Sequence, residues 1–208
     1  MRNRLFFFCL LFILSCSAGR SQSEFPKPVY PLHVIFDTDF GPDYDDVGAI
    51  ALLHAFADTG YIRILATMAS SGYKNVASAI NVFNTYFNRP EIPVGVVGGV
   101  ALELGDRQHW TDSVIKRYPH QIQNNQQAFD ALDLYRKILS SRPDHSVTII
   151  TVGFMTNLAN LLNSAPDQYS VLSGTDLVRK KKSSASFQWA AVSQPAGSSI
   201  SIRIPLLQ

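Results

Sequence analysis

The segment LHVIFDTDFGPDYDDVGAIALLHAFA, residues 32–57, decides the fold that we predict for this chain. It opens with the apolar run 32–36, which is typical of a buried strand. The run ends at a cluster of aspartates, so the strand opens into an acidic loop. Over residues 47–57 the apolar positions recur at helical spacing, and Asp45 and Asp46 stand where carboxylates favour a helix N-terminus. The segment therefore predicts a strand, an acidic loop and a helix.

The alternation of strand and helix patterns continues along the chain. We expect strands at 61–69, 92–97 and 146–152, and helices at 76–87, 128–141 and 157–163. The polar stretch 98–127 is irregular, and we expect it to form a loop over the site. This order predicts an α/β fold with a mainly parallel, helix-covered open sheet. Such sheets place their chemistry at the carboxyl ends of the strands, where the acidic loop lies.

The composition fits one globular domain. The chain has 208 residues, of which 46% are hydrophobic and 16% charged, so it can bury a sizeable core. The formal net charge of +2 is small. Nothing in this balance calls for a nucleic acid as a partner.

The first 18 residues are predicted to be a signal peptide for export. A start with two arginines precedes the apolar run 5–14, which is too short to span a bilayer comfortably. A small residue precedes Cys16, as in a bacterial lipoprotein signal, so lipidation at Cys16 and ordinary cleavage after Ala18 or Gly19 are both open. Residues 19–31 would be a tether, and the protein would be periplasmic or anchored to a membrane by lipid.

Both cysteines lie in this leader. The mature domain would therefore have no thiol, which excludes disulfides, thiolate catalysis and cysteine-ligated zinc.

The acidic loop is the main candidate for chemistry. Residues 37–46 place five carboxylates in ten positions, which is electrostatically unfavourable unless a cation is present. A set of oxygen donors without His or Cys suits Ca²⁺ or Mg²⁺, and calcium better tolerates irregular geometry. The spacing is not that of an EF-hand. The alternative is a solvated acidic turn that caps a helix.

Two separated motifs carry a resemblance to a known family. The sequence DTDFG at 37–41 followed by DDVGA at 45–49 resembles the N-terminal signature of the inosine-uridine preferring nucleoside hydrolases. The sequence TVGFMTNLA at 151–159 is similar to a strand-loop-helix segment of the same family, although Thr156 and Asn157 could also simply cap a helix. The resemblance covers residues 32–181 and implies the N-terminal part of a Rossmann-like core.

This chain has two more residues in the acidic loop than the usual family motif. We align the extra residues as Asp43 and Tyr44 because the helix begins directly after Asp45 and Asp46. Asp43 remains the alternative to one member of that pair.

The resemblance implies a calcium-dependent hydrolase that splits the N-glycosidic bond of ribonucleosides into ribose and free base. Carried over to this chain, Asp39 and Asp46 would be calcium ligands, and the carbonyl of Val152 would complete this half of the shell. Asp39 would also be the general base toward the attacking water. An intact protein would be a dimer or tetramer.

Three further residues receive supporting roles from the resemblance. Asp45 would hydrogen-bond a ribose hydroxyl, and Asp37 would orient the loop from behind. Asn75 would bind ribose as a displaced form of the family's Gly-Asn, which is replaced here by the segment SSGYKN at 70–75.

The family pattern ends at about Lys181. The later landmarks of the family, among them a C-terminal aspartate ligand and a leaving-group histidine, have no counterpart in residues 182–208, an atypical serine-rich tail with one expected strand at 200–204. We hypothesise a reading-frame shift at the lysine run 180–182; the alternative is a genuine variant C-terminus. The truncated chain would then have little or no turnover.

A haloacid-dehalogenase-like phosphatase is one alternative. Such enzymes also begin with an apolar strand followed by Asp-x-Asp, as in Phe36-Asp37-Thr38-Asp39, and use Mg²⁺. Gly41 departs from their pattern, and the tandem Asp45-Asp46 favours the nucleoside hydrolase.

A non-catalytic surface lipoprotein that binds nucleosides or sugars is the other alternative. Trp110, Tyr73 and Tyr118 could stack on a base or sugar, although packing is the commoner role of such rings. His54 falls in a helical pattern and is expected to be packed or at the surface. His109 is the one histidine that we would consider near a substrate.

Overall fold

The computed structural model describes residues 31–42 and 44–181. Several predicted features lie outside the described residues: the signal peptide 1–18 with Cys16, the tether up to residue 30, Asp43, the tail 182–208 and its strand at 200–204.

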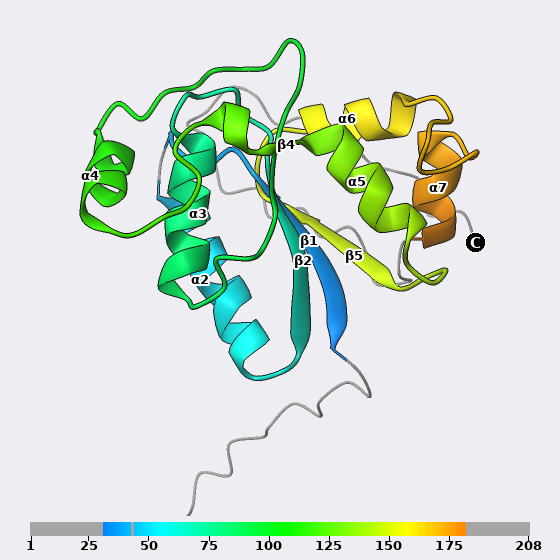
Figure 1. The fold of residues 1–208 in the computed structure, drawn as a ribbon, viewed down its shortest axis with the longest axis horizontal. Coiled ribbons are helices and arrows are strands. Elements are labelled where there is room, and N and C mark those ends of the chain that lie inside the picture. Colours follow the sequence, from blue (N-terminus) through cyan, green and yellow to red (C-terminus); the bar gives the residue numbers. More distant parts are fainter. Residues whose placement is uncertain (1–30, 43, 182–208) are drawn as a thin grey trace, which may run out of the picture.

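Within the described residues, five strands form one sheet in which every pairing is parallel. The order across the sheet is β4-β3-β2-β1-β5 (Figure 1). The strands are β1 (Leu32–Thr38), β2 (Ile62–Ala69), β3 (Val94–Val96), β4 (Phe129–Asp130) and β5 (Val147–Thr151). The helices are α2 (Asp45–Asp58), α3 (Val76–Tyr86), α4 (Trp110–Arg117), α5 (Ala131–Ser140), α6 (Thr156–Asn163) and α7 (Gly174–Lys181). The predicted parallel, helix-covered α/β fold is confirmed.

Helices cover both faces of the sheet and create two hydrophobic cores. Along β1 the side chains alternate, so that Val34 and Phe36 pack with α2 and α3 while Ile35 packs with α5, α6 and α7. This two-sided burial explains why the strand is apolar without a break. None of the helices in the described part of the chain is long and apolar enough to cross a membrane.

The prediction that residues 98–127 are irregular is wrong in part. It contains α4 and a 3-10 turn, η1 (Asn125–Gln127). The carboxylate of Asp106 accepts hydrogen bonds from the backbone N of Thr111 at 2.7 Å and from its hydroxyl at 2.9 Å. This local capping starts a helix, WTDSVIKR, that is too polar to show a clear hydrophobic period in the sequence.

Two other elements differ from the prediction. Residues 129–130 form β4 instead of the start of a helix, because Asp130 caps α5 by accepting a hydrogen bond from the backbone N of Asp133 at 3.0 Å. The helix α7 was not predicted. Its start is a reciprocal pair in which the Ser173 hydroxyl donates to Asp176 at 2.7 Å and accepts from the Asp176 backbone N at 3.2 Å.

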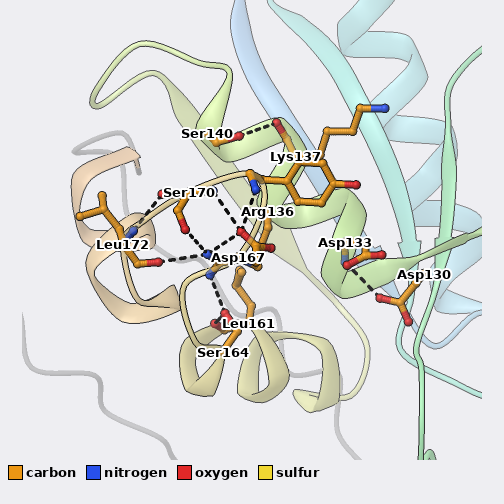
Figure 2. Close-up of polar contacts among 11 residues, drawn as sticks. Asp130, Asp133, Arg136, Lys137, Ser140, Leu161, Ser164, Asp167, Ser170 and Leu172 are labelled. Carbon is orange, nitrogen blue, oxygen red and sulfur yellow. Dashed lines mark hydrogen bonds and ion pairs between the residues drawn. The ribbon is translucent and has the colours of Figure 1, made fainter.

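A buried arginine ties α5 to the segment between α6 and α7 (Figure 2). The side chain of Arg136 is 1% exposed and forms two hydrogen bonds with the carboxylate of Asp167, at 2.6 and 2.9 Å. It also donates to the Ser164 hydroxyl and to the carbonyls of Ser170 and Leu172. Each of the three guanidinium nitrogens donates to at least one oxygen, so the charge of Arg136 is matched within the fold.

Candidate active site

The acidic loop starts at the carboxyl edge of the sheet, where β1, β2 and β5 end together. In the sheet register, Asp37 lies between Met68 of β2 and Thr151 of β5. The backbone N of Val152 donates to the carbonyl of Asp37 at 2.9 Å, which extends the pairing beyond the strand. This is the edge at which parallel sheets place ligands.

Asp37 is buried beneath the loop, on the face covered by α5 and α6. One of its carboxylate oxygens accepts hydrogen bonds from the Tyr135 hydroxyl at 2.8 Å and from the Asn157 amide at 3.1 Å. Burial raises the pKa of Asp37 from 3.8 to about 7, and the charge of Asp39 adds to this, while the two hydrogen bonds lower it. Asp37 therefore links β1 to two helices from a position closed to solvent.

The Asn157 contact also decides between the two interpretations of the second motif. The side chain of Asn157 bonds Asp37 and the carbonyl of Ala69, and the residue at the N-cap of α6 is Met155, with no side-chain capping bond. Thr156 and Asn157 are thus not a simple helix cap.

Asp39 and Asp46 form the centre of the site. Asp39 is half-buried, whereas Asp46 is 1% exposed and accepts a hydrogen bond from the Thr38 hydroxyl at 2.6 Å. Burial raises the pKa of Asp39, the nearby charge of Asp45 raises it further, and a hydrogen bond with Asp46 opposes the shift. Two carboxylates held this close repel each other unless a proton or a cation offsets their charge.

The approach of the β5 loop to this pair depends on Gly153. A Cβ at Gly153 would collide with the backbone N of Asp39 and would lie 2.5 Å from the carbonyl carbon of Thr38 and 2.6 Å from the Ser70 hydroxyl. Only glycine permits so close an approach, and it brings the Val152–Gly153 peptide beside Asp39. The sequence motif contained this glycine, but its role follows only from the structure.

Of the six predicted site residues, the structure brings five to the carboxyl edge of the sheet and engages the sixth in other contacts. Asp37 lies beneath the pair Asp39 and Asp46 and bonds Val152, and Asp45 is exposed at the start of α2 within electrostatic reach of Asp39. The amide of Asn75 instead donates to the Tyr73 hydroxyl at 3.2 Å and to Asp112 of α4 at 2.6 Å.

The donors present fit part of a hard-cation site. Within residues 31–42 and 44–181, no group of three or more His, Cys, Asp or Glu side chains is arranged to hold a metal ion. The pair Asp39 and Asp46 nevertheless has the chemistry of two calcium ligands, since carboxylate oxygens are what this ion prefers. The carbonyl of Val152 is the third donor that the resemblance implied.

The aromatic and histidine side chains near the site are mostly engaged in packing. Trp110 lies 5.3 Å from the ring of Phe40, between ring centroids, and donates to the carbonyl of Gly41. His54 is fully buried, bonds Asn84 at 3.1 Å, and has its pKa lowered to about 4 mainly by burial. His109 is exposed beside Asp112. His54 was expected to be packed or at the surface, and the structure shows it packed.

The comparison with protein families gives a match over most of the described chain. The model of the family described as inosine-uridine preferring nucleoside hydrolase matches residues 34–174. No curated protein matches the chain.

Solved structures with a similar fold include two effector proteins. The effector protein XOO4466 is 18% identical with a TM-score of 0.57, and the match covers 82% of this chain and 47% of that one. The type III effector protein XopQ, solved with adenosine diphosphate ribose, gives the same TM-score, identity and coverage of this chain, with 46% of its own length covered. At this identity the likeness shows the fold alone.

A plant nucleoside hydrolase, PpNRh1, is 27% identical over 62% of this chain and 42% of its own, with a TM-score of 0.43. The chain thus spans less than half the length of all three solved proteins.

Proposed function

The chain belongs to the inosine-uridine preferring nucleoside hydrolase family, and on that premise we propose that its acidic loop is the calcium-binding part of a site for N-glycosidic bond hydrolysis. The observation that carries the proposal is that Asp39 and the buried Asp46, which the Thr38 hydroxyl holds, lie close together at the carboxyl edge of the sheet. Two like-charged groups kept close in partly desolvated surroundings are unfavourable by themselves, and a divalent cation would relieve their repulsion.

Each aspartate of the loop has a distinct part in this proposal. Asp39 and Asp46, with the carbonyl of Val152, would hold the ion, which supplies Lewis-acid activation of water and a fixed point for the ribose hydroxyls. Asp39 would accept the proton of the attacking water, and its raised pKa suits a general base. The exposed Asp45 would accept a hydrogen bond from a ribose hydroxyl.

The reaction would break the bond between the anomeric carbon and the base nitrogen. Water oxygen would bond to that carbon through an oxocarbenium-like transition state, and the departing base would take up a proton. Thr38 holds Asp46, and Tyr135 and Asn157 hold Asp37, so the residues around the pair are fixed in place before a substrate arrives.

We expect the 208 residues alone to bind calcium more readily than they turn over substrate. Calcium takes about six to eight oxygen ligands, and the described residues supply two carboxylates and one candidate carbonyl. Ribose hydroxyls, water or donors beyond the described residues would fill the other positions.

Thermal unfolding of residues 19–208 with and without calcium tests the proposal. We expect calcium to raise the melting temperature of the wild type and to have no effect on Asp39→Ala or Asp46→Ala. Asp133→Ala is the matched control, because Asp133 is an exposed aspartate in the first turn of a different helix. Release of base from inosine and uridine, with an aryl phosphate as the phosphatase control, would be assayed on the same samples. Equal stabilisation of all four proteins would contradict the proposed site.

We also propose that the protein is exported and lipid-anchored through Cys16. Metabolic labelling with a radioactive fatty acid should mark the wild type and leave Cys16→Ser unlabelled. Labelling of neither protein would favour ordinary cleavage of the leader.

A further inference from the structure

We propose that Trp110 is a positioning residue that holds the acidic loop from outside, through the start of α4. The contacts that support this are independent of any ligand. The consequence for calcium rests on the proposed function above, and the two are separated in the experiment below.

The acidic loop turns at Gly41, and this turn is held by two aromatic residues. Gly41 has a φ of 151°, which strongly favours glycine, and a Cβ there would lie 3.2 Å from the ring of Tyr73. The indole N–H of Trp110 donates to the Gly41 carbonyl at 3.0 Å. Tyr73 therefore packs against the Gly41 turn, and Trp110 holds the turn through the hydrogen bond to the Gly41 carbonyl.

Trp110 also packs on the residues that flank this turn. Its ring centroid is 5.3 Å from that of Phe40 and 5.8 Å from that of Tyr44. Phe40 is fully buried and makes an edge contact with Phe83 of α3, and Phe83 contacts Trp110 in turn. Edge-to-face contacts of this kind add specific geometry to the burial of apolar area.

The start of α4 is itself rigidly fixed, so that Trp110 is a firm support. Asp106, 4% exposed, accepts three hydrogen bonds, one from the backbone N of Gln108 and two from Thr111. Because the Thr111 hydroxyl gives its proton to Asp106, the Tyr73 hydroxyl is the donor in the 3.1 Å bond between Tyr73 and Thr111. A second path thus runs from α4 through Tyr73 to the same turn.

The acidic loop needs such support because the helix that follows it lacks a cap of its own. Tyr44 stands at the N-cap of α2 and makes no side-chain capping bond, yet α2 begins with Asp45 and Asp46. Tyr44 is instead held by Trp110 and by a hydrogen bond between its hydroxyl and Gln108. The position of the two carboxylates thus depends on α4.

The test uses a Trp189→Phe background, in which Trp110 is the only tryptophan of the chain. Trp110→Phe keeps an aromatic ring and loses the N–H donor, whereas Trp110→Leu loses the ring as well. Phe87→Leu is the matched control, because the Phe87 ring stacks on His54 at 4.7 Å and, among the described residues, has no direct ring contact with the acidic loop. Amide hydrogen exchange of a peptide covering residues 40–46 is measured in each protein without calcium.

We expect exchange in residues 40–46 to be about two- to tenfold faster in Trp110→Phe, the range for loss of one hydrogen bond of ordinary net strength, and faster still in Trp110→Leu. Exchange in this peptide should be unchanged in Phe87→Leu. Unchanged exchange in Trp110→Phe, or equal acceleration in Phe87→Leu, would overturn the inference.

The calcium experiment adds a readout that a merely structural role would not move. Calcium should shift the fluorescence of Trp110 in the Trp189→Phe background, and its affinity by calorimetry should fall by about two- to tenfold in Trp110→Phe but not in Phe87→Leu. If calorimetry detects calcium binding and the fluorescence of Trp110 does not change, the positioning role of Trp110 is contradicted. If the wild type binds no calcium, the proposed function fails, and the exchange experiment alone decides the role of Trp110.

Discussion

Two charged clusters, one between the helices on one face of the sheet and one at its carboxyl edge, differ in whether the fold matches their charge. Arg136 lies between α5 and the segment before α7 and meets a carboxylate, a hydroxyl and two carbonyls. Asp39 and Asp46 lie at the carboxyl edge and meet each other. The positive charge of Arg136 is paired and hydrogen-bonded within the fold, whereas the aspartate pair concentrates negative charge.

This difference separates a structural cluster from a functional one. A fold that only needed stability would not place a buried carboxylate against a second one, since the repulsion lowers the free energy of unfolding. We therefore propose that the pair serves a ligand, whereas the arginine cluster needs none. The predictions below test this distinction.

The largest expected effect is on the arginine cluster. Replacing Arg136 with Met should lower the free energy of unfolding by about 3 kcal/mol, because Asp167 would lose its partner; the value is at the low end for buried pairs since the Asp167 side chain keeps 26% exposure. Urea unfolding measures this. The exposed Arg117→Met is the control and should change stability little. A small loss of unfolding free energy in Arg136→Met would contradict the stabilising role of the arginine cluster.

The next effect is a fall in stability as the pH rises. The pKa of Asp37 is about 7 in the folded protein against an ordinary value of 3.8, so the folded state binds more protons between these values and stability is lost as pH rises through them. We expect a loss of about 2 kcal/mol between pH 4 and pH 7, well within what a shift of this size allows. Urea unfolding in a chelating buffer over this range measures it.

The matched variant for the pH experiment is Asp37→Asn, which cannot titrate. Its stability should depend on pH much less than that of the wild type over the same range. An equal slope in both proteins would show that other groups control the pH dependence.

At the aspartate pair we expect a smaller change in the free energy of unfolding, with a sign opposite to that for Arg136→Met. Asp46→Asn keeps an oxygen that can accept from Thr38 and removes one of the two like charges. Without metal it should raise the free energy of unfolding by about 1 kcal/mol at neutral pH, while removing stabilisation by calcium. Arg136→Met and Asp46→Asn would then differ in sign, and a loss of stability in both would contradict the distinction between the two clusters.

The parts of the fold that follow from local sequence could be predicted. The strand at 32–38, the acidic loop and the helix α2 are encoded by consecutive residues, and the parallel sheet follows from the alternation of elements. Helix α7 was missed although Ser173 and Asp176 carried a capping signal.

Contacts between distant residues could not be predicted in the same way. Tyr135 reaches Asp37 across 98 positions, and Trp110 reaches Gly41 across 69. Neither residue stands in a motif that marks such a partner, and α4 is too polar for periodicity to reveal it. The sequence therefore indicated which aspartates to propose as the site, and the structure was needed to find the residues that contact them.

The most direct test of the central claim is isothermal titration of calcium into residues 19–208 of the wild type and of Asp46→Asn. We predict one calcium ion bound per chain of the wild type and no binding to the variant, because the pair Asp39 and Asp46 supplies the charge that attracts the ion. Absence of binding to the wild type, or equal binding to both proteins, would contradict the assignment of this loop as a calcium site.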